Sequence, residues 1–96
     1  MPLYAVLGNW TEKGIQAVKQ APLRGESVRK AVEAAGGKVH AFLNTMGTFD
    51  IVAVFELPSD EVANQVLLRA GMLGFVRTTT LKGWSPADFA QLVQRL

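Results

Sequence analysis

Two short hydrophobic runs constrain the fold of this chain more than any other feature. Residues 3–7 (Leu-Tyr-Ala-Val-Leu) and 51–55 (Ile-Val-Ala-Val-Phe) are hydrophobic at every position. Their length suits β-strands and falls far short of the roughly 18 residues that a membrane-spanning helix requires. Because successive side chains of a strand point to opposite faces of its sheet, both faces of these strands need to be covered. We therefore expect them at the centre of one sheet.

Helix and strand signals alternate along the rest of the chain. Pro22 interrupts a helical pattern, Gly36-Gly37 marks a helix end, and Gly47-Thr48 forms a tight turn between two strand patterns. Ser59 and Ser85 are each followed by residues typical of the first turn of a helix. The expected elements are a strand (3–10), helical segments on either side of Pro22 (11–35), strands at 38–46 and 49–57, a helix from Ser59, a strand (75–83) and a C-terminal helix from Ser85.

The order β-α-β-β-α-β followed by a helix predicts an α+β fold of the ferredoxin-like type, as a single domain spanning residues 1–96. Its sheet is antiparallel, with the two hydrophobic runs as the central strands and the helices on one face. The other face of this sheet would then expose hydrophobic side chains to water. We expect the sheets of two chains to pack face to face and cover them. The alternative is that the C-terminal helix folds back over its own sheet.

Composition also favours self-association as a source of stability. A chain of 96 residues buries a limited core, and small domains commonly gain stability from disulfides, metals or oligomerisation. Cysteine is absent and His40 is the single histidine, so a disulfide is excluded and a histidine-rich metal site cannot form within one chain. We expect a homodimer or a higher oligomer. Since the N-terminus lacks the features of a signal peptide, we expect a cytoplasmic protein with no membrane segment.

The charge pattern does not indicate a nucleic-acid-binding surface. Ten Lys and Arg residues stand against eight Asp and Glu residues, which gives a net charge of +2. Six of the basic residues, Arg24 among them, fall within residues 13–38, and we interpret them as the solvated face of a helix. Aromatic residues that could stack on nucleic-acid bases do not interleave with these positive charges.

Three segments of the chain resemble the GYD-domain family, in the order in which that family has them. Residues 42–52 (Phe-Leu-Asn-Thr-Met-Gly-Thr-Phe-Asp-Ile-Val) resemble its Gly-x-Tyr-Asp hairpin, residues 74–81 its last strand, and the opening strand with residues 10–15 its N-terminal segment. The resemblance covers nearly the whole chain. It implies a ferredoxin-like, dimeric α/β-barrel fold and no established activity. Phe49 stands where the family name expects tyrosine, so the phenolic hydroxyl is missing at that position.

The hairpin supplies the candidate ligand-binding residues, which are His40, Asn44 and Asp50. A two-residue turn at 47–48 predicts that His40, Phe42 and Asn44 share one face of the sheet. That face could line a small pocket; alternatively, His40 is an edge-strand residue partly in solvent. The predicted pairs are Asn44 with Ile51, Phe42 with Ala53, and His40 with Phe55.

Asp50 lies beside an apolar strand, where a buried carboxylate needs a partner. Three roles remain open for it: bonding the amides of the turn, pairing with Arg77 or another cation, or contacting a ligand.

Functional motifs are otherwise scarce. The chain contains no nucleophile–base–acid set, no phosphate-binding glycine loop and no metal-ligand spacing, so we expect neither cofactor nor metal. We predict a small oligomeric domain that binds a small molecule or mediates an interaction. The alternative is a cofactor-free enzyme of the monooxygenase or isomerase type, with His40, Asn44, Asp50 and Trp10 in an apolar pocket. A closed apolar cavity that holds His40 would favour the enzyme.

Overall fold

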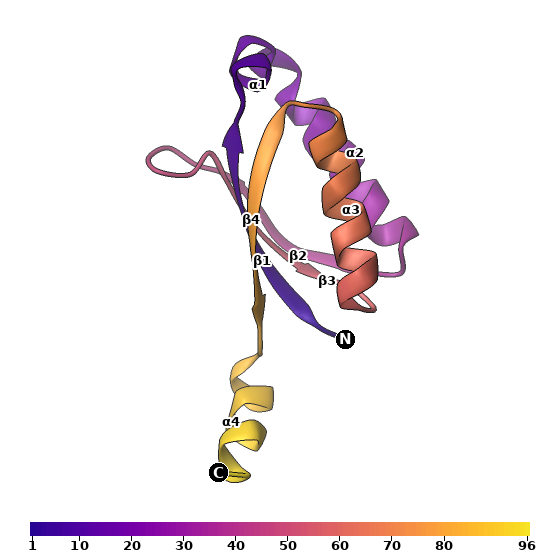
Figure 1. Ribbon diagram of the computed structural model, residues 1–96, viewed down its shortest axis with the longest axis vertical. Coiled ribbons are helices and arrows are strands. Elements are labelled where there is room, and N and C mark those ends of the chain that lie inside the picture. Colours follow the sequence, from indigo (N-terminus) through magenta and orange to yellow (C-terminus); the bar gives the residue numbers. More distant parts are fainter.

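The computed structural model describes residues 1–96 and has the predicted order of elements (Figure 1). Its four strands form one antiparallel sheet in the order β2-β3-β1-β4, so the two hydrophobic runs occupy the centre. The predicted α+β, ferredoxin-like fold is confirmed. The elements are β1 (Leu3–Trp10), α1 (Glu12–Gln16), the 3-10 turn η1 (Val18–Gln20), α2 (Ala21–Ala34), β2 (Lys38–Asn44), β3 (Ile51–Glu56), α3 (Asp60–Met72), β4 (Val76–Gly83) and α4 (Pro86–Gln94).

Hydroxyl side chains begin three of the helices. The side-chain oxygens of Thr11, Ser59 and Ser85 accept hydrogen bonds from the main-chain N–H three residues further on, which would otherwise lack a partner. The helix starts predicted at Ser59 and Ser85 are confirmed. Pro22 lies in the first turn of α2, where its missing N–H costs no hydrogen bond, so the helical segment restarts there after η1.

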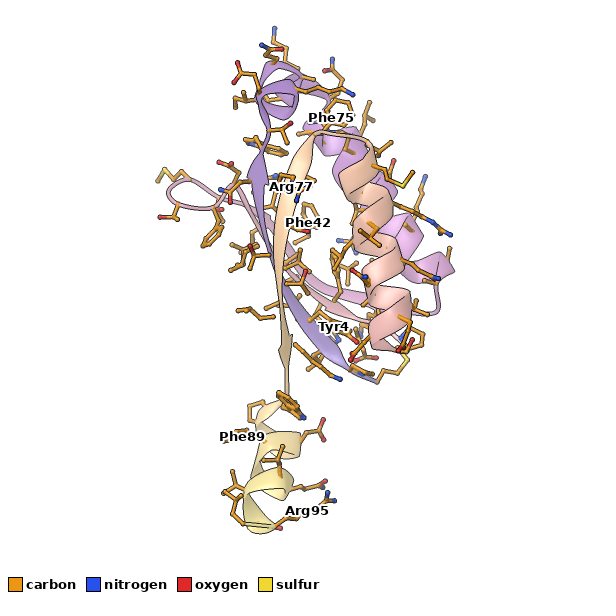
Figure 2. The ribbon with its side chains drawn as sticks, viewed as in Figure 1. Tyr4, Phe42, Phe75, Arg77, Phe89 and Arg95 are labelled. Atoms are coloured by element: carbon orange, nitrogen blue, oxygen red, sulfur yellow. The ribbon has the colours of Figure 1, made fainter.

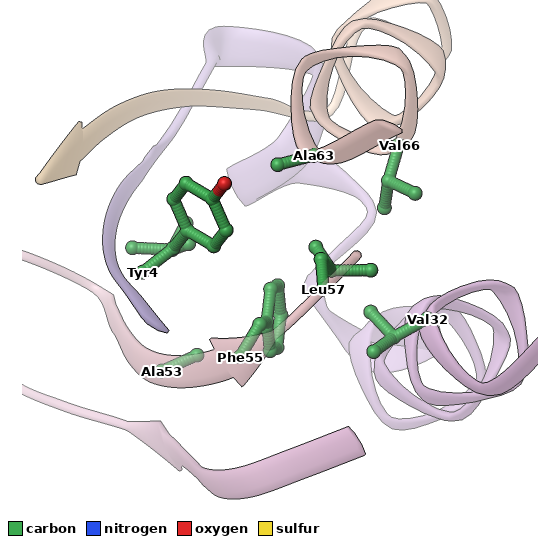
Figure 3. Packing of buried hydrophobic residues seen from close by; sticks show 8 residues of the cluster. Tyr4, Val32, Ala53, Phe55, Leu57, Ala63 and Val66 are labelled. Carbon is green, nitrogen blue, oxygen red and sulfur yellow. The ribbon is translucent and has the colours of Figure 1, made fainter. Parts of the chain in front are cut away.

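The hydrophobic core lies between the sheet and the helices α2 and α3 (Figure 3). Alternate residues of the two central strands point into it, and α2 and α3 cover them from one side. Phe55, Leu57 and Val32 are the largest fully buried side chains. The core residues are Tyr4, Val6, Val32, Ala53, Phe55, Leu57, Ala63 and Val66.

The opposite face of the sheet is hydrophobic and has no cover. Figure 1 shows that α4 extends from the end of β4 away from the sheet, so the alternative in which this helix covers its own sheet is wrong. Leu43 and Leu81 are 57% and 54% exposed. We call this surface the open face; its central residues are Leu3, Ala5 and Leu7 of β1 and Val52 and Val54 of β3.

The predicted register of the hairpin is correct near the turn and wrong further from it. Asn44 pairs with Ile51 and Phe42 with Ala53, as predicted. The predicted pair of His40 with Phe55 is wrong, because a β-bulge between Val39 and Ala41 places Val39 opposite Phe55. An extra residue in one strand moves the neighbouring side chain to the other face. His40 therefore does not share a face with Phe42 and Asn44.

None of the helices combines the length and the apolar composition that crossing a membrane requires.

Candidate functional site

A cavity of about 310 Å³ lies between the sheet and the helices α2 and α3. Eleven of its sixteen lining residues are hydrophobic, and they come from the strands as well as from both helices. We call it the interlayer cavity; the residues used below are Trp10, Arg24, Phe42, Asn44, Arg69 and Phe75. A groove of about 610 Å³ between α3 and β4 is larger, but it is more open and only half of its twelve lining residues are hydrophobic. Since ligand sites are typically enclosed and mostly apolar, the interlayer cavity is the better candidate.

Small residues in the helices leave this space unfilled. Gly25 lies within α2, where glycine costs about 1 kcal/mol relative to alanine. A Cβ atom at this position would lie 3.4 Å from Cε1 of Phe42, at the limit of ordinary contact. Ala31 of α2 and Ala70 of α3 line the same space with single methyl groups. Phe42, labelled in Figure 2, forms part of the wall from the side of the sheet.

Arg24 is the unusual member of the cavity wall. Its guanidinium carbon lies 4.2 Å from the ring centroid of Phe75 and 5.9 Å from that of Trp10. Nη1 donates a hydrogen bond of 3.1 Å to the carbonyl oxygen of Ala17, whereas Nη2 is buried without any partner. A buried donor without a partner costs on the order of 1–3 kcal/mol, and more when it is charged. Contacts with the two aromatic faces offset part of this cost.

The charge around the cavity is entirely positive. Arg24 and Arg69 line it, and no aspartate or glutamate does. The chain's two ion pairs lie elsewhere: His40 with Glu56, and Lys82 with Asp60. Arg24 thus has no carboxylate within 4.0 Å, and the cavity presents an uncompensated cation in apolar surroundings.

Of the three predicted site residues, the structure brings only Asn44 to the cavity. His40 lies on the other side of the sheet, where its Nε2 is 3.1 Å from Oε1 of Glu56. Oδ2 of Asp50 accepts a 2.8 Å hydrogen bond from the main-chain N–H of Trp10. The carboxylate therefore bonds an amide of β1 instead of an amide of the turn or the side chain of Arg77.

Arg24 and Phe75 line the cavity but are not among the site residues predicted from the sequence. Arg24 belongs to the basic group of residues 13–38, which we interpreted as solvated, and its side chain instead packs under two aromatic rings. One available signal was the position of Arg24 two residues after Pro22, in the first turn of a restarted helix.

Comparison with known proteins supplies the family. The sequence profile of the GYD domain matches residues 4–93, which is nearly the whole chain. The chain belongs to the GYD-domain family. The predicted resemblance is confirmed, with Phe49 in the place of the family's tyrosine. Curated proteins include no match to this GYD domain.

A solved structure supports the fold of this GYD domain. The crystal structure of TTHA0845 from Thermus thermophilus superposes with a TM-score of 0.56 and 22% sequence identity, and the match covers 88% of this chain and 95% of that chain. At this level of identity the likeness shows a shared fold.

Outside the interlayer cavity, a cluster of three polar side chains joins the sheet of the GYD domain to the start of α3. The hydroxyl of Tyr4 donates a 2.6 Å hydrogen bond to Oδ1 of Asp60, and Nζ of Lys82 lies 3.0 Å from the same oxygen. Burial of the phenol, reinforced by the hydrogen bond and the negative charge of Asp60, raises the pKa of Tyr4 to about 12. The same hydrogen bond, together with Lys82, lowers the pKa of Asp60. Each of the three groups thus has a partner within the chain, and the cluster connects the start of α3 to β1 and β4.

Proposed function

We propose that this GYD domain is a cytoplasmic, homo-oligomeric module that binds a small molecule in the interlayer cavity. The observation that carries the proposal is the cavity itself: a partly open, mostly hydrophobic space beside a half-buried arginine whose Nη2 is buried without a partner. Ligand pockets are concave and lined mostly by hydrophobic side chains with a few polar groups, and this cavity has a lining of that composition. Its volume lies at the lower end of the range of ligand pockets.

Asn44 is the predicted site residue that supports this location. Its side chain lines the cavity from β2 and can both donate and accept a hydrogen bond, which would orient a bound molecule. The enzymatic alternative has less support, because a cavity that holds His40 was the observation that would favour it, and His40 lies on the other side of the sheet.

The open face supports the oligomeric part of the proposal. Its hydrophobic residues belong to the central strands, and the only helix that could have covered them, α4, points away (Figure 1). At about 25 cal/mol per Å² of apolar area, burying even ~500 Å² contributes roughly 12 kcal/mol before the costs of association. A second copy of the chain offers the same hydrophobic surface, which a two-fold contact would bury on both sides.

Filling the cavity tests the proposal directly. Ala70→Leu adds three carbons to the lining, so a ligand identified by thermal shift on the natural sequence should raise the melting temperature of this variant little or not at all. Ala34→Leu is the matched control, because Ala34 is an exposed residue of α2 that does not line the cavity. The same ligand should stabilise the control as strongly as the natural sequence.

Two further variants locate the ligand within the domain. Asn44→Ala should weaken ligand binding, whereas His40→Ala should leave it unchanged, because the two residues lie on opposite sides of the sheet. The proposed location is wrong if Ala70→Leu and Asn44→Ala both bind the ligand as well as the natural sequence does.

A further inference from the structure

We infer that the ligand of the interlayer cavity is an apolar molecule with a single carboxylate, and that Arg24 binds this carboxylate. This inference rests on the proposed function, in which the cavity holds a ligand. It adds the chemical class of that ligand. Three features of the structure lead to it: the incomplete hydrogen bonding of Arg24, the absence of a neighbouring acid, and the size of the cavity.

The hydrogen-bonding capacity of Arg24 is mostly unused. A guanidinium group has five N–H donors, and only Nη1 meets an acceptor, the carbonyl oxygen of Ala17. Nη2 is shielded from solvent and bonds to nothing. The guanidinium carbon lies 4.2 Å from the ring centroid of Phe75. Since a guanidinium that packs on an aromatic ring can still donate hydrogen bonds from its edge, this contact and anion binding can coexist. Buried polar groups of this kind are normally satisfied, and an acceptor from outside the chain would satisfy this one.

The missing acceptor is a negatively charged one. Because no aspartate or glutamate lines the cavity, the chain supplies no counter-charge for Arg24 or for Arg69. A carboxylate matches the planar fork of an arginine and can form two parallel hydrogen bonds with it. A phosphate group would bring more charge and more acceptor oxygens than this mostly hydrophobic lining can satisfy. One carboxylate on an apolar body fits the lining best.

The volume limits the apolar body. At about 30 Å³ for a water molecule, a cavity of about 310 Å³ accommodates on the order of ten water-sized groups. Phenylacetate and octanoate are aromatic and linear acids of this size. Their amides, phenylacetamide and octanamide, have the same shape without the charge, so each acid and its amide form a matched pair of probes.

Isothermal titration calorimetry on the full chain separates the charge from the shape. At least one of the two acids should bind the natural sequence ten-fold or more tightly than its amide. In Arg24→Met, which keeps an apolar stem and removes the charge, this preference should disappear while binding of the amide stays unchanged. Arg29→Met is the matched control, since Arg29 is an exposed arginine of the same helix, and it should keep the preference. If Arg24→Met does not fold, Arg24→Lys, which keeps the charge but loses the fork, should still weaken the acid several-fold and spare the amide.

The possible outcomes distinguish the ligand class from the proposed function. Equal binding of acid and amide by the natural sequence contradicts the carboxylate ligand and leaves the cavity as a binding site. A preference for the acid that survives in Arg24→Met, or that is undiminished in Arg24→Lys, contradicts the role of Arg24. Binding of none of the four probes contradicts the proposed function itself.

Discussion

Tyr4 is a buried side chain with one polar atom, and a single contact satisfies that atom. The residue lies on β1 and belongs to the hydrophobic core of the domain. Its hydroxyl donates a hydrogen bond to Asp60 in the first turn of α3. The tyrosine therefore contributes both packing and a hydrogen bond that fixes the start of the helix against the sheet. Its ionisation would place a charge in the core and beside a carboxylate, and both effects favour the neutral phenol.

Stability should consequently fall at alkaline pH. The pKa of Tyr4 is about 12 in the folded chain against 10.0 for an ordinary tyrosine, so the unfolded chain releases this proton first. The contribution of Tyr4 is fully present below pH 10 and is lost progressively as the pH rises to about 12. Because Tyr4 is the only tyrosine of the chain, the ultraviolet absorbance of tyrosinate measures its titration alone.

Asp60→Asn provides the control for this titration. The variant should lower the pKa of Tyr4 but keep it above the ordinary value, because burial is the larger cause of the shift. A natural-sequence midpoint at the ordinary value would contradict the burial of the phenol.

The roles of individual residues were less predictable from the sequence than the fold was. Arg24 and Lys19 look alike as basic residues of one helical region. Only the contact of Arg24 with Phe75, which lies 51 residues further along the chain, distinguishes it from the exposed Lys19. The caps Thr11, Ser59 and Ser85 were predictable, because the partner of each lies three residues away in the chain.

At the scale of elements, the hairpin of β2 and β3 shows how far local rules extend. The turn fixes the pairs nearest to it, Asn44 with Ile51 and Phe42 with Ala53. The bulge after Val39 lies beyond the range of the turn, and nothing in the pattern of residues 38–41 distinguishes a bulged strand from a regular one. One extra residue was enough to move His40 to the opposite side of the sheet from Asn44.

The turn itself should be sensitive to substitution at Gly47. Its φ of +112° lies in a region that side chains with a Cβ atom rarely adopt, and the space around it is open. Gly47→Val should therefore lower the free energy of unfolding by about 1–3 kcal/mol through backbone strain alone. Gly83→Val is the matched control, since Gly83 also has open space but lacks the positive φ, and its stability should change little. Urea unfolding measures both; equal stability of the two variants would mean that the turn relaxes without cost.

At the scale of the whole molecule, the sheet separates two hydrophobic regions with different roles. The helices bury one face around the core and the interlayer cavity, while the other face has only the side chains of its own strands. The sequence predicted this division, because the runs at 3–7 and 51–55 are hydrophobic on both faces of their strands. It could not predict the direction of α4, which depends on the few residues that join it to β4.

The open face should hold the oligomer together. The double variant Leu43→Lys and Leu81→Lys places two charges on it at positions that are 57% and 54% exposed in one chain, so the fold of that chain should tolerate them. Multi-angle light scattering should show a dimer or a multiple of it for the natural sequence and a monomer for the variant. Leu68→Lys, at a residue that is also 57% exposed but lies on α3, should retain the oligomer. A stable monomer of the natural sequence at micromolar concentration would refute the proposed assembly.

The two tryptophans end strands at opposite ends of the sheet, and this placement gives the domain two separate fluorescent reporters. Trp10 lies in the wall of the interlayer cavity beside Arg24. Trp84 lies between the end of β4 and the start of α4, and it is 54% exposed. In a Trp84→Phe variant, the emission comes from the cavity alone, so its wavelength and quenching follow the occupancy of that space. In a Trp10→Phe variant, the emission follows the surroundings of the C-terminal helix. Occupancy of the cavity and the environment of α4 can thus be observed independently in the same protein.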